Sequence, residues 1–224
     1  NPLTPIKLSA QRLQKKFGEQ ILDPVFKDCT DMIIKEADEL KNMVNEFHQF
    51  SRMPQAHPVM SSLNEVIENL LVLYQTGHKD IKFVYQAGVD IPIFSFDPDL
   101  IKRALMNLLE NSIASLDGRN LPEITLLTQY NNDSKIVRIE ILDNGSGIPK
   151  AMLRKVFEPY VTMKEQGTGL GLAIVQRIIE DHNGFVRALA NKSQGTRIVI
   201  ELPIGEQRKY DVLKTSFMQG EAPV

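Results

Sequence analysis

The sequence predicts an α+β fold, in which a helical hairpin precedes an α/β sandwich with a mixed sheet covered by helices on one face. Residues 1–53 place apolar residues at spacings of three and four, the period of helices that bury one side. The rest of the chain alternates short apolar runs, which come in neighbouring pairs, with helical segments. Paired antiparallel strands interrupted by helices are typical of a mixed sheet with its helices on one face.

Composition narrows the class of protein. A chain of 224 residues with 42% hydrophobic residues and a net charge of −2 can build one full core and a smaller element. No apolar run approaches the roughly 20 residues that span a bilayer, so we expect membrane attachment only through regions outside this sequence. The absence of a basic tract gives no support for nucleic-acid binding. The single Cys29 excludes an internal disulfide and a cysteine-cluster zinc site, and it favours a cytoplasmic location.

The first part of the chain is expected to form two helices. The first ends at Phe17 before the turn residue Gly18, and the second runs from about Pro24 to Phe50. The second helix carries a narrow apolar seam, made of Cys29, Ile33, Ala37, Leu40, Val44 and Phe47. Two helices with one seam each cannot bury themselves alone, so we expect a homodimer through a four-helix bundle. The alternative is a hairpin packed on its own domain.

Prolines at positions 54 and 58 disfavour a continuing helix and indicate a domain boundary. We therefore expect a hairpin domain at 1–53, a second domain at 54–205 and a C-terminal tail at 206–224. Within the second domain, periodicity predicts helices at 62–75 and 169–182, and a further helix opened by Asp97. Strands are predicted at 81–86, 92–96, 124–130, 136–142, 185–190 and 196–202.

Asp143 is the first candidate for a functional residue. It follows a half-buried strand and stands before Gly145 and Gly147, in a turn where the backbone can approach a ligand closely. Taken alone, an acid followed by two glycines is also an ordinary tight loop. Asn107 and Asn111 lie four apart beside the apolar stripe of a helix, so both amides share one side. Taken alone, such amides also cap neighbouring loops.

A glycine-rich stretch opens the helix at 169–182. Gly167, Gly169 and Gly171 present backbone N–H groups where a helix begins, which is a ready site for an anion. The stretch is not a Walker loop, because no Gly-Lys-Ser/Thr follows it. It is not a dinucleotide fingerprint either, because the preceding segment, 160–166, is polar and loop-like. We interpret that segment as a lid.

Four stretches together, in this order and spacing, closely resemble the N, G1, F and G2 boxes of the sensor histidine kinases: Asn107–Asn111, Asp143–Gly147, Phe157–Tyr160 and Gly167–Leu172. These kinases belong to the GHKL superfamily of ATPases and kinases, shared with gyrase, MutL and a heat-shock chaperone. The resemblance implies a GHKL-type fold for the second domain, with ATP and Mg²⁺ as cofactors.

The resemblance also implies roles for single residues. Asp143 would accept the exocyclic amine of adenine, Asn111 would bind Mg²⁺, and Asn107 would contact phosphate or metal-bound water. Lys164 in the lid would approach the terminal phosphates. The remaining expected nucleotide contacts are Gly145, Gly147, Gly167, Thr168, Gly169, Leu170, Gly171 and Thr196.

The hairpin resembles the dimerisation and phosphotransfer domain of the same kinases, whose first helix carries H-E-x-x-[NT]-P-L-T-P. The sequence begins with Asn1-Pro2-Leu3-Thr4-Pro5, so the phosphoacceptor histidine is expected four residues before Asn1. Without it, the chain is expected not to phosphorylate itself. Asn1 would fall on the position that assists dephosphorylation of the response regulator. His48 lacks the H-E-x-x-N-P context, and we interpret it as a solvated helix residue.

Two departures from the family pattern refine this prediction. The hydrolases and serine kinases of the superfamily carry a glutamate where this chain has Asn107, so transfer to histidine is favoured over ATP hydrolysis. Ala114 and Ser115 replace a lysine and an aromatic residue, so phosphate charge would be met elsewhere, by Arg103 or Lys164. The chain thus resembles the nitrogen-regulation sensors of the NtrB/NtrY type.

The sequence is therefore interpreted as the catalytic part of a two-component sensor histidine kinase. It would transfer the γ-phosphoryl group of ATP to a histidine, and onward to an aspartate of a response-regulator receiver domain. The alternatives are a GHKL-type ATPase and a nucleotide-responsive docking module without kinase activity. Transfer to a supplied histidine-containing hairpin would separate the module from the kinase.

Overall fold

The computed structural model describes residues 3–21, 23–51, 55–164, 167–191 and 194–204. The chain divides into two compact units, Asn1–Met53 with Thr162–Leu170, and Pro54–Val161 with Gly171–Val224. The expected boundary at 52–54 and the expected tail at 206–224 lie outside the described residues. No helix in the described ranges is long and apolar enough to cross a membrane.

The two predicted helices of the hairpin are present as α1 (Leu3–Phe17) and α2 (Pro24–Ser51). Gly18 N–H donates to Gln14 O at 2.8 Å and closes the last turn of α1. Small residues at the contact, Ala10 and Ala37, are 3% and 5% exposed, so the two helices approach closely. A Lys7–Asp38 ion pair of 2.7 Å joins the helices beside this contact.

Much of the predicted seam of α2 stays uncovered within one chain. Ala37 faces α1, but four apolar members of the seam are between 40% and 48% exposed: Ile33, Leu40, Val44 and Phe47. Cys29, the first member of the seam, is also exposed. Apolar side chains repeating along one side of a helix are typical of a surface that packs against another chain.

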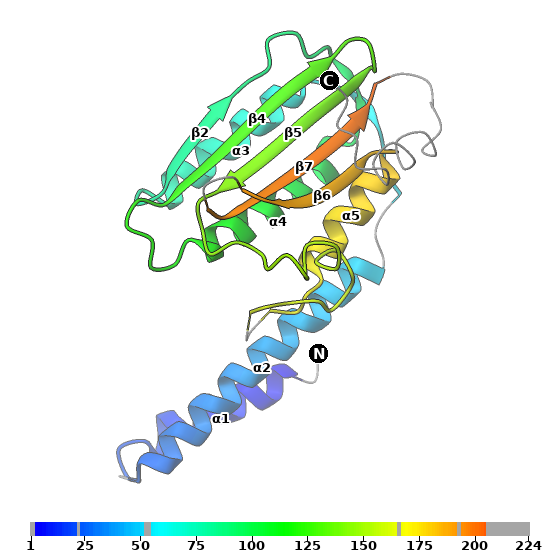
Figure 1. The fold of residues 1–224 in the computed structure, drawn as a ribbon. Helices are drawn as coiled ribbons and strands as arrows, with labels where there is room; N and C mark the ends of the chain where they lie inside the picture. The colour runs from blue at the N-terminus through cyan, green and yellow to red at the C-terminus, as the bar shows by residue number, and fades with distance from the viewer. Residues whose placement is uncertain (1–2, 22, 52–54, 165–166, 192–193, 205–224) are drawn as a thin grey trace. The chain divides into compact units, whose positions relative to one another are not determined.

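The second unit contains a five-stranded sheet in the order β2-β4-β5-β7-β6. Its strands are β2 (Lys82–Gln86), β4 (Glu123–Asn131), β5 (Ile136–Asp143), β6 (Phe185–Ala190) and β7 (Thr196–Pro203). Strands β2 and β4 are parallel, and the other pairs are antiparallel. The predicted mixed sheet is confirmed, and Figure 1 shows it face on.

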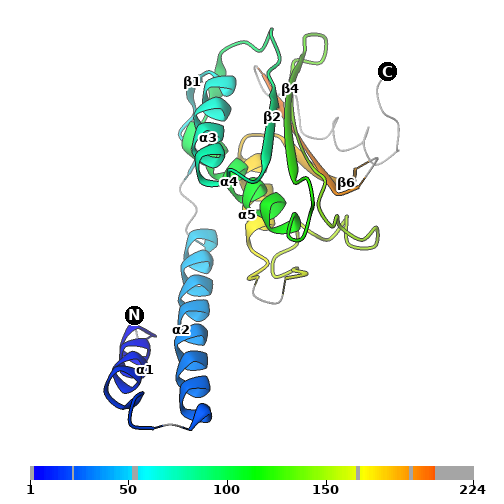
Figure 2. The ribbon, with the colours of Figure 1, turned by 90° about the vertical axis from the view of Figure 1, so that its left-hand side faces the viewer.

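Three helices cover one face of this sheet: α3 (Leu63–Gly77), α4 (Pro98–Ser115) and α5 (Gly171–Asp181). Figure 2 shows all three on the same side of the strands. Four apolar side chains that β4 and β5 direct toward the helices are no more than 1% exposed: Ile124, Leu126, Ile139 and Ile141. This buried layer holds the ends of β5 and α4 in fixed positions.

Most predicted boundaries differ from the structure by one or two residues, and two of the differences have a local reason. Helix α5 begins at Gly171, two residues later than expected, because Gly169 has φ +70°, which is outside the helical range. The strand expected at 92–96 is shorter, β3 (Phe94–Phe96). It pairs with β1 (Val59–Ser61) in a separate two-stranded sheet that the sequence did not predict, because three residues are too few to show a period.

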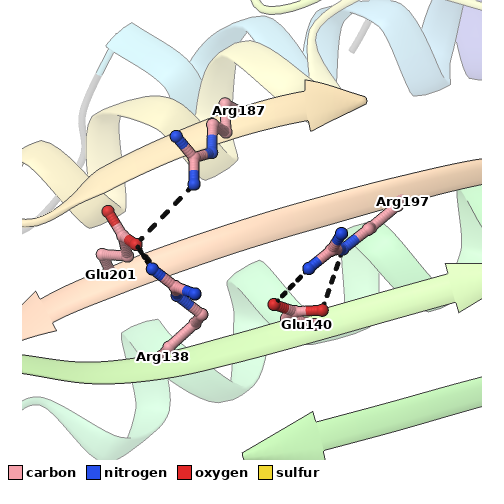
Figure 3. Close-up of polar contacts among 5 residues, drawn as sticks. All are labelled: Arg138, Glu140, Arg187, Arg197 and Glu201. Carbon is pink, nitrogen blue, oxygen red and sulfur yellow. Dashed lines mark hydrogen bonds and ion pairs between the residues drawn. The ribbon is translucent and has the colours of Figure 1, made fainter. Parts of the chain in front are cut away.

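The sheet face that points away from the helices carries a network of charged side chains (Figure 3). Arg138 on β5 donates two hydrogen bonds to Glu201 on β7, at 2.7 and 3.0 Å. Arg187 on β6 approaches the same carboxylate at 3.8 Å. Next to them, Arg197 and Glu140 form a bidentate pair at 2.6 and 2.8 Å. These pairs link β5, β6 and β7 in one register.

Candidate functional site

Asp143 ends β5 and is 4% exposed. One carboxylate oxygen, Oδ1, accepts three hydrogen bonds: from Gly145 N–H at 2.9 Å, Thr196 N–H at 3.1 Å and Ser115 Oγ at 3.2 Å. The other oxygen, Oδ2, lies 3.5 Å from Ser112 Oγ, at the limit of a hydrogen bond. A buried carboxylate is tolerated when donors surround it, so the three donors fix Asp143 in the buried end of β5.

The turn after Asp143 packs closely on the end of α4. A Cβ added to Gly145 would meet the backbone oxygen of Ser115 at 2.6 Å, so only glycine fits there. Ser146 N–H donates to the same Ser115 oxygen at 3.0 Å, which satisfies a carbonyl at the end of the helix. Arg119 donates to Gly145 O at 2.7 Å and holds the other side of the turn. The predicted glycine turn thus packs directly against the end of α4 and is hydrogen-bonded to it.

The residues just before β7 also contact Asp143, in addition to the end of α4 and the turn after β5. Gly195 has φ +94°, and a Cβ there would lie 2.1 Å from Asp143 O. Gly147 has φ +78° and faces Gly195. A Cβ added to Gly147 would lie 3.1 Å from Gly195 O. Asn191 donates from its side chain to Asp143 O at 3.0 Å. The end of α4, the turn after β5 and the start of β7 therefore meet at Asp143.

Asn107 and Asn111 lie beside the first residue of α5. A Cβ added to Gly171 would lie 3.6 Å from Asn107 Oδ1 and 3.8 Å from Asn111 Nδ2, so both amides face the beginning of that helix. Both residues are partly exposed. The first turn of a helix presents N–H groups without partners inside the helix, and its dipole favours negative charge. Two amides next to such a helix start can bind an anion and a hard metal ion together.

Comparisons with known proteins agree with this geometry. A family model described as "Histidine kinase-, DNA gyrase B-, and HSP90-like ATPase" matches residues 96–206, and one described as "His Kinase A (phospho-acceptor) domain" matches residues 1–56. Nitrogen regulation protein NtrY of Azorhizobium caulinodans is 38% identical over 194 residues. The chain belongs to the sensor histidine kinase family.

The kinase relatives are longer than this chain. The NtrY match covers 83% of the chain and 25% of that protein. The signal transduction histidine-protein kinase AtoS of Escherichia coli is 33% identical over 210 residues, which are 92% of the chain and 33% of that protein. The chain therefore spans about a quarter to a third of the length of these curated relatives.

Solved kinase structures confirm the predicted fold class. The structure of histidine kinase ThkA in complex with response regulator protein TrrA has a TM-score of 0.69 and 27% identity to this chain. The match covers 93% of this chain and 59% of that one. The separate catalytic domain of ThkA has a TM-score of 0.58 and 31% identity, over 66% of this chain and 96% of that one. The chain thus comprises the catalytic region of a histidine kinase, with its hairpin.

The structure brings some of the predicted kinase site residues together and leaves others as predictions. Asp143, Gly145, Gly147 and Thr196 form one group, and Asn107 and Asn111 meet Gly171. Residues 162–170 are grouped in the other unit, so roles for Lys164, Gly167, Thr168, Gly169 and Leu170 stay predictions. Asn1 lies outside the described residues, and so does its expected role.

Sequence reasoning missed three residues that hold Asp143 in this kinase. Ser115 was noted only as a departure from the family pattern, although its spacing of four from Asn111 places it on the same side of α4. Ser112 is a buried polar residue within an apolar helix face, which is a signal that could have been used. Asn191 gave no signal, because its contact depends on the path of the hairpin between β6 and β7.

Proposed function

We propose that this chain binds ATP with Mg²⁺ and transfers the γ-phosphoryl group to a histidine. The observation that carries the proposal is the buried carboxylate of Asp143, whose Oδ1 accepts three donors from three separate segments. A carboxylate fixed in this way presents its second oxygen, Oδ2, in a constant direction. Such a fixed acceptor suits recognition of one edge of a flat base.

Adenine fits this acceptor better than guanine does. The exocyclic amine of adenine would donate to Asp143 Oδ2, whereas guanine carries a carbonyl at the equivalent edge. Two acceptors facing each other would leave both without a donor, which costs about 1–3 kcal/mol for a buried group. The proposed site therefore selects adenine nucleotides.

The phosphates would lie at the start of α5, where Gly171 stands beside Asn107 and Asn111. Within the described residues, no three His, Cys, Asp or Glu side chains are gathered to hold a metal by themselves. Amide oxygens are neutral, hard ligands, and Mg²⁺ commonly keeps water and bridges nucleotide phosphates. The residues present fit such an ion, with Asn111 as its ligand and Asn107 on phosphate or bound water. When bound, Mg²⁺ would offset the charge that develops on the phosphates.

Transfer to histidine, and not to water, follows from the chemistry of Asn107. An amide cannot accept a proton from water at neutral pH, so no general base stands at this position next to the phosphates. The site would then work by holding the γ-phosphoryl group in line with an incoming imidazole. None of the four histidines in the sequence stands in the H-E-x-x-N-P context, so the assay below supplies the acceptor on a separate hairpin. Asn1 would orient a water molecule that hydrolyses the phosphoryl group of the regulator, which releases free phosphate.

The expected partners belong to the same proposal. ThkA is complexed with a response regulator, and we propose that phosphate passes from the histidine to an aspartate of such a receiver domain. The uncovered seam of α2, with the match to the phosphoacceptor family, supports a homodimer through the hairpin. A cytoplasmic location, where ATP is available, completes the proposal.

A phosphotransfer assay tests the proposed reaction. The chain is incubated with Mg²⁺, γ-labelled ATP and a separately purified hairpin that carries a histidine in the H-E-x-x-N-P context. We expect acid-labile label on that hairpin, and none when its histidine is replaced by glutamine. Label released as free phosphate at the same rate without the acceptor would indicate an ATPase. ATP binding with no transfer would indicate a docking module.

A further inference from the structure

We propose that Ser115 is the positioning residue that sets the direction of the Asp143 carboxylate, and so controls how strongly the site discriminates adenine. The inference rests on the proposed nucleotide site and adds a specificity-determining side chain to it. Ser115 does not need to touch the base, because it acts through Asp143.

Ser115 is the only side-chain donor within 3.2 Å of the Asp143 carboxylate in the part of the chain that the structure describes. The other two donors to Oδ1 are the backbone N–H groups of Gly145 and Thr196. Backbone donors are set by the path of the chain. The Ser115 hydroxyl is therefore the contact at Oδ1 that a single substitution can remove without changing the fold.

The single proton of this hydroxyl has two acceptors. Ser115 Oγ lies 2.8 Å from Ser112 O, one turn back in α4, and 3.2 Å from Asp143 Oδ1. Both distances are within hydrogen-bond range, and a charged acceptor binds a hydroxyl proton more strongly than a neutral one. The proton is therefore shared in a three-centre bond between the carbonyl and the carboxylate. This arrangement ties the carboxylate to the end of α4.

Three donors on one oxygen leave little room for Asp143 to rotate. With Oδ1 fixed by Gly145, Thr196 and Ser115, the plane of the carboxylate is set and Oδ2 keeps its direction. Without the hydroxyl, two backbone donors hold Oδ1, and Oδ2 keeps only the long contact of 3.5 Å with Ser112 Oγ among the described residues. The carboxylate can then turn more freely about the bond to its Cβ. An acceptor that is not held in place makes a weaker bond to the base amine, because ordering it then costs entropy.

The shape of the site also matches a small hydroxyl at this position. An added Cβ on Gly145 would lie 2.0 Å from Ser115 Oγ, so the hydroxyl occupies the space that the glycine leaves. Ser115 and Gly145 therefore form a fitted pair. A larger side chain at position 115 would not fit against this turn.

Two ligands and one substitution test the inference. Dissociation constants of Mg²⁺·ADP and of the diphosphate of purine riboside, which lacks the exocyclic amine, are measured by calorimetry for the wild-type chain and Ser115→Ala. We expect Ser115→Ala to weaken ADP roughly five- to tenfold, the loss of one hydrogen bond near a charged group. The analogue should be unaffected within about twofold, because it makes no bond to Asp143 for Ser115 to strengthen. Thermal unfolding without nucleotide checks that the variant is folded.

The other outcomes are distinguishable. Equal weakening of both ligands would show a general loosening of the site and overturn the inference. Unchanged ADP affinity in Ser115→Ala would overturn it as well. In both cases the proposed function would stand, since the wild-type chain binds ADP. A wild-type chain that binds neither ligand would contradict the proposed function itself.

Discussion

Thr196 N–H donates to Asp143 Oδ1 at 3.1 Å, although 53 residues separate the two in sequence. The bond joins the first residue of β7 to the last residue of β5, and these neighbouring strands run in opposite directions. The position of Asp143 therefore depends on the hairpin that precedes β7. Substitutions in that hairpin should reach the nucleotide site without touching the nucleotide.

Gly195→Ala should destabilise the second unit and weaken nucleotide binding. The new Cβ would lie 2.1 Å from Asp143 O, and the residue has φ +94°. A strained backbone and an overpacked contact cost about 1–3 kcal/mol each, so we expect a loss of about 2–6 kcal/mol in unfolding free energy. Urea unfolding measures the loss, and calorimetry with ADP measures the effect on the site.

Gly118→Ala is the matched control for that substitution. Gly118 has φ +72°, but no atom lies within 4 Å of its added Cβ. It therefore measures the cost of the backbone conformation alone, about 1–2 kcal/mol. Similar losses in both variants would mean that the contact between Gly195 and Asp143 contributes nothing.

Asp97 should stabilise α4 in a pH-dependent manner. Its Oδ1 accepts the N–H groups of Asp99 and Leu100, and its Oδ2 accepts His57 N–H at 2.8 Å. Burial alone would raise the pKa of Asp97, but these backbone donors hold it below its ordinary value of 3.8. Asp97→Ala should lower the unfolding free energy by about 1–2 kcal/mol at neutral pH.

The sign of the pH dependence follows from the direction of that pKa shift. A lowered folded-state pKa stabilises the protein fully above the unfolded value, near 3.8, and the benefit is lost as the pH falls through the lower folded value. The difference between wild type and Asp97→Ala should therefore persist from pH 7 to 5 and shrink below pH 3.8. Asp90→Ala, at an exposed position, is the control. A difference that grows on acidification would contradict the account.

Glu201 should be a strong contributor to the stability of the sheet. Its side chain is 2% exposed, and removing it would leave Arg138 and Arg187 next to each other without their shared anion (Figure 3). Breaking a buried pair costs about 3–5 kcal/mol. Since Arg138 is 32% exposed, we expect Glu201→Ala to fall near 3 kcal/mol in urea unfolding.

Glu123→Ala is the control for the Glu201 variant, because Glu123 also pairs with a cation across two strands. Lys82 Nζ lies 2.8 Å from Glu123 Oε2, but the side chain of Glu123 is 40% exposed and that of Lys82 is 69% exposed. An exposed ion pair contributes about 0–1 kcal/mol. If both variants lose the same stability, burial of Glu201 is not the cause.

Asn107→Glu should turn the site toward ATP hydrolysis. The new carboxylate would lie next to the start of α5, where Asn107 stands now, and could take a proton from water near the γ-phosphate. We expect acceptor-independent phosphate release to rise about tenfold, which is less than a general base usually contributes, because the surrounding site is not arranged for the new carboxylate. Asn107→Gln introduces a side chain as long as glutamate but keeps an amide in place of the carboxylate, so it should not show the rise. Equal rates in the two variants would mean that Asn107 does not limit hydrolysis.

The elements that the sequence predicted well are those with a clear period and a local stop signal. The seam of α2, the Asp97 cap of α4 and the strand that ends at Asp143 all appear close to where they were expected. The missed strand β1 has three residues, and its pairing with β3 depends on a partner more than thirty residues away. Local periodicity carries no information about such a pairing.

The candidate site was predictable in its residue types but not in its contacts. Asp143 and its glycines stand together in sequence, so they were found as a motif. The roles of Ser115 and Asn191 depend on how α4 and the hairpin before β7 meet at the end of β5. The same holds for Glu201 and Arg138, whose pairing follows from strand register. These contacts belong to the tertiary fold, and spacing in sequence does not encode them.

The central claim is that Asp143 and Asn111 form an adenine-nucleotide site. Calorimetric titration of the chain with ADP and Mg²⁺, repeated with GDP and with Asp143→Asn and Asn111→Ala, tests it most directly. The account predicts that the wild-type chain binds ADP selectively. Asp143→Asn should weaken ADP binding toward the affinity for GDP. ADP binding to Asn111→Ala should no longer depend on Mg²⁺. Equal affinity for ADP and GDP in the wild-type chain, or no binding of either, would contradict it.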